Sequence, residues 1–150
     1  GAVRWFRRAY DLHQKLGMRK NMGGNRLNLG IVSYKRGDFS QAEIEFRAAI
    51  TLLKEVDAKV PLCRAAIAQG CNQRLQRDFD GARITLNNAY AQANALMLAR
   101  EEALALEFLG DVYRDEGKVE QARQHCTRRR YCHGSDVPAG AMSFASGASQ

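Results

Sequence analysis

Apolar residues recur every three or four positions along most of the first 124 residues, which is the spacing of amphipathic helices. The pattern predicts one helix over residues 27–36 and a second over residues 40–57. Gly37 between them is a typical helix stop, and Asp38 or Ser40 can cap the second helix. These signals together define one pair of helices.

A second helix pair is predicted over residues 62–77 and 80–98. Pro61 suits the first turn of its first helix, where the missing backbone N–H is not needed, and Asp80 can cap its second helix. A third pair begins near Glu101. The chain of 150 residues contains only two prolines, which agrees with a mostly helical protein because proline interrupts helix interiors.

The helix pairs belong to an internal repeat of forty residues. Alanine occupies positions 2, 42, 82 and 122, and glycine occupies positions 30, 70 and 110. Phe6, Phe46 and Leu86 each stand four residues after one of the alanines. We expect the small residues to let helices approach closely and the large ones to fill the space between pairs. Because one pair cannot bury its apolar face alone, the repeat predicts a stacked helical solenoid.

The repeat resembles the tetratricopeptide family. The middle copy departs from the family motif at Gln69 and Arg77, where leucine and glycine are expected. A unit of forty residues is similar to the MalT-type regions of bacterial transcriptional regulators and signalling ATPases. The resemblance implies an all-α, right-handed helical-hairpin solenoid of about three helix pairs in a cytoplasmic protein. The best copy of the motif consists of Leu29, Gly30, Gly37, Phe39, Ala42, Phe46 and Ala49, and the third copy of Leu106, Leu109, Gly110, Tyr113, Gly117, Val119 and Ala122.

The repeats divide the chain into a repeat domain and a tail. The tail, residues 131–150, is rich in glycine, serine and alanine and has no apolar periodicity, so we expect it to be disordered. The domain over residues 1–124 comprises a partial repeat over 1–22, repeats over 23–62 and 63–102, and a degenerate repeat over 103–130.

The first residues match the second helix of a repeat, since Ala2 and Phe6 stand where Ala42 and Phe46 recur. We therefore expect the chain to be a fragment of a longer protein. A helix is predicted over residues 3–16, with its aromatic residues partly exposed. The Gly23-Gly24 pair predicts a loop over residues 17–25 before the next helix.

The formal net charge of +7 is concentrated at the two ends. Residues 1–60 hold twelve basic and six acidic residues, residues 61–124 hold eight and nine, and residues 125–150 hold three and one. Interleaved signs in the middle repeats are typical of a solvated helix surface. The excess leaves nucleic-acid binding as an alternative function rather than the main expectation.

Metal and disulfide chemistry are not expected. Cys63 and Cys71 lie eight residues apart on one predicted helix, which favours a packing role. His125-Cys126 and Cys132-His133 contain zinc-binding residue types, but three arginines separate the two pairs and the usual two-residue knuckle is missing. We therefore predict no metal site, no disulfide and no cofactor.

Catalytic motifs are absent from the sequence, which contains no phosphate loop, no G-x-S-x-G elbow and no H-E-x-x-H helix. Glu101-Glu102 stands at a predicted helix start, where carboxylates complement the helix dipole. The run Arg128-Arg129-Arg130-Tyr131 could contact phosphate groups, although three basic residues are weak support for this role. From the missing motifs we expect a non-enzymatic protein. No stretch approaches about 18 apolar residues, so we also expect no membrane span.

A partner-binding groove is implied by the family architecture, in which the first helix of each pair lines a concave face. From the first repeat to the third, the lining of the expected groove changes from apolar and basic to acidic. Such a groove would fit a helix or peptide of mixed charge. The Lys/Asn/Arg clamp with which some tetratricopeptide domains grip chaperone tails is not found at the matching positions. The groove candidates are Leu27, Ile31, Tyr34, Lys35, Arg64, Ile67, Arg74, Glu107, Asp111 and Arg114.

The sequence thus predicts a protein-interaction or scaffold module that binds a protein, a peptide or a small inducer. The resemblance implies that it is the sensor or partner-binding part of a larger bacterial transcriptional regulator. Two alternatives remain open, a basic solenoid that binds nucleic acid and a structural module that self-associates through its open ends.

Overall fold

The computed structural model describes residues 2–117 and residue 124. All regular secondary structure in these residues is helical, so the all-α prediction is confirmed. The helices are α1 (Ala2–Lys35), α2 (Phe39–Glu55), α3 (Lys59–Leu75), α4 (Phe79–Ala95) and α5 (Ala99–Asp115). The degenerate repeat beyond Gly117, the His/Cys cluster, the run of arginines and the predicted tail lie outside the described residues.

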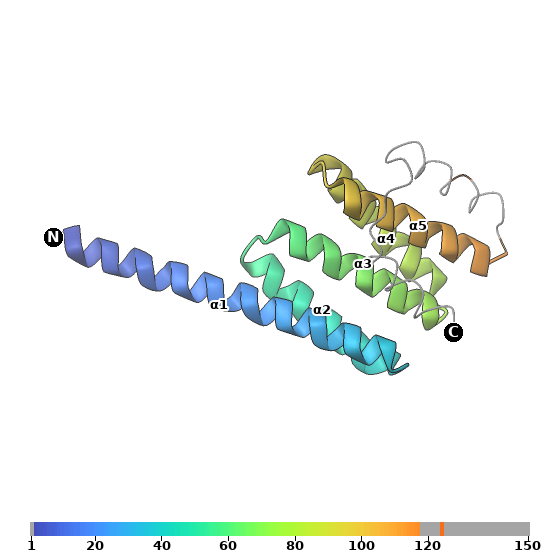
Figure 1. Ribbon diagram of the computed structural model, residues 1–150, viewed down its shortest axis with the longest axis horizontal. Helices are drawn as coiled ribbons and strands as arrows, with labels where there is room; N and C mark the ends of the chain where they lie inside the picture. The colour runs from blue at the N-terminus through green and yellow to red at the C-terminus, as the bar shows by residue number, and fades with distance from the viewer. Residues whose placement is uncertain (1, 118–123, 125–150) are drawn as a thin grey trace.

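Consecutive helices pack as hairpins and form two layers (Figure 1). Each of α2 to α4 packs against the helix before it and the helix after it. In addition, α3 contacts both α1 and α5, so that the first helices α1, α3 and α5 form one layer and the second helices α2 and α4 form the other. The apolar core lies between the layers, with Phe46, Leu86 and Phe108 among its fully buried side chains.

Small and large residues interlock in two repeats, but within each helix pair rather than between pairs as expected. A Cβ atom at Gly30 would lie 2.5 Å from the ring of Phe46, and a Cβ atom at Gly70 would lie 2.5 Å from Cγ of Leu86. Glycine at these positions therefore lets each first helix approach its second helix to the distance at which the large side chain fills the gap. The alanines that accompany them on the second helices, Ala42 and Ala82, are fully buried.

The turns between the helices follow a period of twenty residues. In the first turn the N–H of Gly37 donates to the carbonyl of Tyr34 and the N–H of Asp38 donates to that of Ser33, which is a Schellman motif. The same pair of bonds closes the next three turns. Each described turn contains one residue with positive φ: Gly37, Asp57, Arg77, Met97 and Gly117.

The helix ends correct three details of the sequence interpretation. The left-handed residues Asp57 and Met97 end α2 and α4 two to three residues before the predicted ends. Asp78, rather than Asp80, caps α4, because its carboxylate accepts a bond from the N–H of Gly81. Asp38 caps α2 as predicted, by accepting from the N–H of Gln41.

Met97 offers a test of the turn geometry. Its φ is 58° and its side chain is 88% exposed, so it bears left-handed strain without packing in compensation. Met97→Gly is expected to raise the free energy of unfolding by about 1 kcal/mol, measured by urea denaturation. As a control, Met22→Gly in the interior of α1 should lower it by a similar amount. A loss of stability in Met97→Gly would show that the turn does not carry the strain assigned to it.

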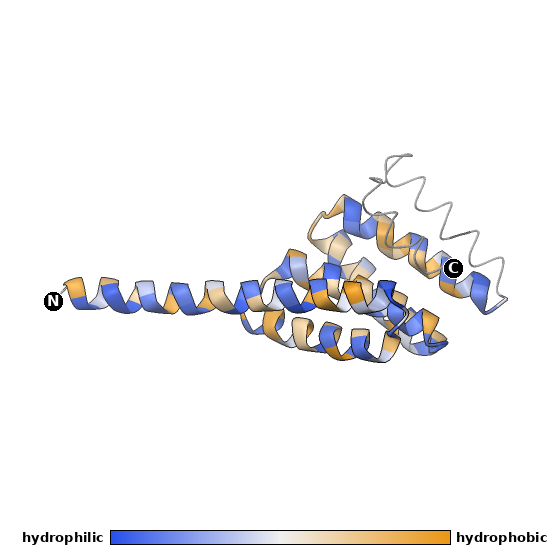
Figure 2. Cartoon of the chain, turned by 60° about the horizontal axis from the view of Figure 1, so that its bottom comes forward, coloured by the Kyte–Doolittle hydropathy of each residue, from blue (hydrophilic) through white to orange (hydrophobic). Residues whose placement is uncertain are grey.

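The predicted loop over residues 17–25 is wrong, because α1 runs without interruption from Ala2 to Lys35. Gly23 is a packing position, since a Cβ atom there would lie 2.8 Å from Leu53. The helix therefore tolerates the glycine, whose intrinsic penalty is about 1 kcal/mol, because it allows close approach to α2. The first half of α1 projects away from the other helices and carries both apolar and polar residues (Figure 2). Trp5 and Phe6 on it are mostly exposed, as expected.

Candidate interaction surface

The three helices of the first layer are linked by a polar cluster around Arg74. The Arg74 guanidinium on α3 is buried and lies 2.6 Å from a carboxylate oxygen of Asp115 on α5. The hydroxyl of Tyr34 on α1 interacts with the same guanidinium. Burial raises the pKa of Tyr34 well above its ordinary value, so the phenol stays protonated. The cluster holds α1, α3 and α5 together, because a buried cation requires partners.

Asp111 lies at the edge of this cluster. Burial raises the pKa of its carboxyl group, whereas the positive charges of Arg114 and Arg74 act in the opposite direction. Arg114 lies 2.6 Å from Asp111 on the same helix, one turn away. The Asp111 carboxylate is therefore mostly covered and holds Arg114 in place, while the Arg114 guanidinium faces water.

Arg64 and Glu101 form a second link between α3 and α5, in which Nε of the arginine donates to the carboxylate at 2.9 Å. The Arg64 side chain is 53% exposed, but the Glu101 side chain is only 6% exposed. Glu101 and Glu102 occupy the first turn of α5, as predicted. Glu102 accepts a hydrogen bond from Asn94 on α4, so both carboxylates also serve in packing.

Four ion pairs share an asymmetry that determines which charge of the pair a partner would meet, whereas in Arg74–Asp115 and Arg83–Asp80 the carboxylate is the more exposed member. In the four pairs the carboxylate is largely covered while the arginine is about half exposed or more. At Arg64 and Arg114 on the first-helix layer, a partner would therefore meet the guanidinium group rather than the carboxylate paired with it. The four pairs are Arg26–Glu45, Arg47–Glu43, Arg64–Glu101 and Arg114–Asp111.

The predicted groove residues divide into accessible and inaccessible groups. Tyr34, Ile67 and Arg74 are buried, so their assignment as partner-facing side chains is wrong. They are covered because α3 packs directly against both α1 and α5 in this layer. Of the other candidates, Lys35, Arg64 and Arg114 are exposed, while Leu27, Ile31, Glu107 and Asp111 are half-buried.

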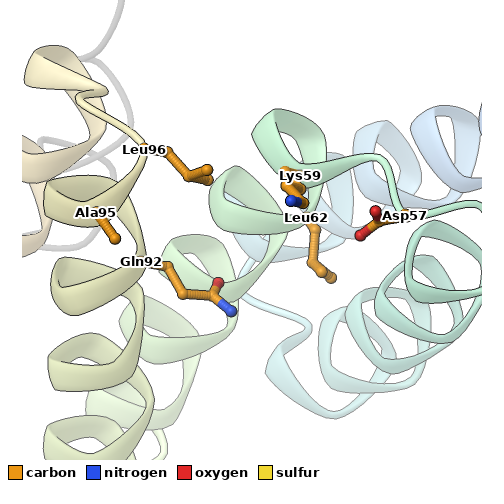
Figure 3. A pocket seen from close by; sticks show the side chains of 6 residues that line it. All are labelled: Asp57, Lys59, Leu62, Gln92, Ala95 and Leu96. Atoms are coloured by element: carbon orange, nitrogen blue, oxygen red, sulfur yellow. The ribbon is translucent and has the colours of Figure 1, made fainter.

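A pocket of about 240 Å³ lies elsewhere, beside the start of α3 (Figure 3). Arg74 stands in the last turn of the same helix. Asp57 and Lys59 contribute charge from the turn between α2 and α3 and the start of α3. Leu62 and Leu96 contribute apolar surface from α3 and the end of α4. Helical spacing in the sequence does not predict this pocket, because its residues belong to helix ends that only the turns bring together.

The described residues provide no obvious reactive or metal-binding group. Within them, no set of three or more His, Cys, Asp or Glu side chains is arranged to hold a metal ion. Cys63 and Cys71 are buried free thiols, in agreement with a packing role. Burial raises the pKa of Cys63 to about 11 and that of Cys71 well above its ordinary value. Protonated, covered thiols are poor nucleophiles. No helix in the described part is long and apolar enough to cross a bilayer.

Comparison with known proteins supports the fold alone. No family model matches the chain, and no curated protein matches it. The fold is similar to that of BtubC (BKLC) from P. vanneervenii, with a TM-score of 0.69 and 18% sequence identity. The similarity covers 87% of this chain and 55% of the BtubC chain, so it spans about half of that protein. The tetratricopeptide resemblance stays a prediction.

Proposed function

We propose that this chain is a non-enzymatic protein-interaction module that binds an acidic helix or peptide on the first-helix layer. The observation that carries the proposal is the pairing of exposed arginines with covered carboxylates on that layer, at Arg64 and Arg114. The sequence suggested a partner of mixed charge. The burial of Glu101 and the partial burial of Asp111 narrow the expected partner to an acidic one.

The anchored arginines are suited to this role for two physical reasons. A guanidinium has five N–H donors in a rigid fork, so it can bond its own carboxylate and a second one. In addition, the intramolecular ion pair restricts the arginine rotamers before a partner arrives. This reduces the ordering entropy of binding, which is about 0.5–1.5 kcal/mol per flexible side chain.

The wider context of the module is also a proposal. The forty-residue repeat resembles the MalT-type regions of bacterial regulators, which supports a sensor or partner-binding role within a larger cytoplasmic protein. Binding on the first-helix layer would then be transmitted to an effector domain.

Removing the two arginines tests the proposal. Acidic helical peptides of sixteen residues would be selected against the unmodified chain, and the affinity of the best peptide measured by fluorescence anisotropy. The double variant R64Q/R114Q is expected to bind about tenfold or more weakly, since tenfold corresponds to about 1.4 kcal/mol.

The matched control is R47Q, which also removes an exposed arginine that pairs with a covered carboxylate. Both members of this pair lie on α2 in the second layer, so the control should retain the affinity of the unmodified chain. Weakening in R47Q equal to that in R64Q/R114Q would contradict a specific role for the first-helix layer. Urea denaturation of both variants checks that they remain folded.

A second candidate function is binding to the nucleic-acid backbone, which one observation favours. Helix α1 carries eight basic residues and a single acidic one, Asp11, and its projecting half is exposed. Phosphate binding by such a helix would weaken steeply with salt. Titration of a random 20-base-pair duplex distinguishes the two functions. A salt-dependent affinity that R64Q/R114Q leaves unchanged would favour this candidate.

A further inference from the structure

Gly17 stands at the position of a turn although it lies inside α1. The described turns place a positive-φ residue every twenty positions, from Gly37 to Gly117. Counting back twenty residues from Gly37 reaches Gly17. A Cβ atom at Gly17 would meet nothing within 4 Å, so packing does not require glycine there, in contrast to Gly23 and Gly30. A mid-helix glycine without a packing role is unfavourable in a straight helix but suited to a left-handed turn.

The residues after Gly17 also fit the start of a separate helix. Each of α2, α3, α4 and α5 has 17 residues, and α1 counted from residue 19 to its end at Lys35 has the same length. The first helices α3 and α5 start after the apolar caps Ala58 and Leu98. Met18 holds the equivalent position in α1.

The second half of α1 exposes a face that is covered in the other first helices. On α3, Gln69 and Asn72 donate hydrogen bonds to α2. Their equivalents on α5 are Leu109 and Val112, both fully buried. The equivalents on α1 are Leu29 and Val32, the same residue types as on α5, yet they are 50% and 45% exposed. This face of α1 therefore has the apolar residues of a helix–helix contact, but no described helix packs on it.

The first half of α1 carries the complementary face. Val3, Phe6 and Tyr10 stand forty residues before Glu43, Phe46 and Ile50 of α2. Glu43 accepts a hydrogen bond from α3, and Phe46 lies fully within the core. By contrast, all three α1 residues are at least 67% exposed.

We propose that α1 is a hinged element in which a turn at Gly17 folds residues 2–16 back onto the face that contains Leu29 and Val32. The closed form would repeat the hairpin of α2 and α3 and add a second-layer helix on the open side of α1. The straight helix is the open form. Closure brings the basic residues Arg8 and Lys15 toward Arg19 and Arg26, so repulsion opposes it. We therefore expect salt to favour the closed form.

Distances between spin labels at Arg4 and Asn28 separate the two forms. At 1.5 Å per residue the straight helix places these positions about 36 Å apart, whereas packed helices lie about 8–10 Å apart. The full chain with Cys126 and Cys132 changed to serine would be used, since Cys63 and Cys71 are buried. Double electron–electron resonance should resolve a second population below about 20 Å that grows between 0.05 and about 1 M salt.

Two alanine variants provide the matched control. Gly17→Ala favours the helix and disfavours the left-handed turn, so it should reduce the ratio of closed to open chains by about tenfold or more. Gly24→Ala adds a methyl group in equally open space on a segment that is helical in both forms, and should leave the ratio unchanged. A single distance near 36 Å at every salt concentration would overturn the hinge. So would a short distance that Gly17→Ala does not reduce, or one that dilution with unlabelled chain abolishes.

Discussion

Gly70→Val is expected to lower the free energy of unfolding by about 3 kcal/mol, the upper part of the range for overpacking a core. A Cβ atom at this position would already lie 2.5 Å from Cγ of Leu86, and both residues are buried between α3 and α4. The extra methyl groups of valine must therefore separate the two helices or force Leu86 out of its rotamer. Urea denaturation followed by far-UV circular dichroism measures the loss.

A double-mutant cycle shows whether the clash with Leu86 is the cause. Leu86→Ala alone should cost about 2–5 kcal/mol because it leaves a cavity. If the two side chains compete for one space, the double variant should lose less stability than the two single variants lose together, by at least about 1 kcal/mol. Strict additivity would contradict the interlock. Gly24→Val, with no neighbour within 4 Å, controls for the β-branched residue in a helix.

Stability is expected to fall steeply above pH 9 because of two buried thiols. Burial raises the pKa of Cys63 from 9.0 to about 11, and that of Cys71 well above 9.0. In the unfolded chain both thiols ionise near pH 9, so the unfolded state binds fewer protons between pH 9 and 11. The stabilising contribution of the protonated thiols is therefore fully present below pH 9 and is lost as the pH rises above 9. Cys63 contributes about 1.4 kcal/mol per pH unit in this window, and Cys71 acts in the same direction.

At pH 10.5 the Cys63 thiol should cost about 2 kcal/mol relative to pH 8, and Cys71 adds to this loss; urea denaturation in the presence of a reductant measures it. The double variant C63A/C71A is the control and should lose much less between the same two pH values. The buried phenol of Tyr34, whose pKa is also raised, adds to the loss only above pH 10. A difference that persists unchanged in the double variant would show that the thiols are not its source.

Much of the fold was predictable because its strongest determinants are local. The recurrence of Gly30 with Phe46 and of Gly70 with Leu86 identified the helix pairs, although the interlock of these residues lies within each pair rather than between pairs. The twenty-residue period was missed because the turns after α2 and α4 use Asp57 and Met97 rather than glycine. Left-handed residues with side chains have no clear signature in a single sequence.

The interaction surface was less predictable, since burial at this layer depends on distant residues. Arg74 lies on the predicted face of its helix but is buried, and its ion-pair partner Asp115 lies on α5, 41 positions away. The same long-range packing covers Glu101 beneath Arg64. Helical spacing assigns a residue to a face, but it does not show which neighbour covers that face.

The most direct test of the proposed partner-binding surface is a backbone NMR titration of the full chain with its best acidic peptide. We expect the largest chemical-shift changes to cluster on the first-helix layer, around Lys35, Arg64 and Arg114. We expect little change on the outer face of α2, around Arg47. Changes concentrated on α2 and α4, or on the projecting half of α1 alone, would contradict a binding site on the first-helix layer.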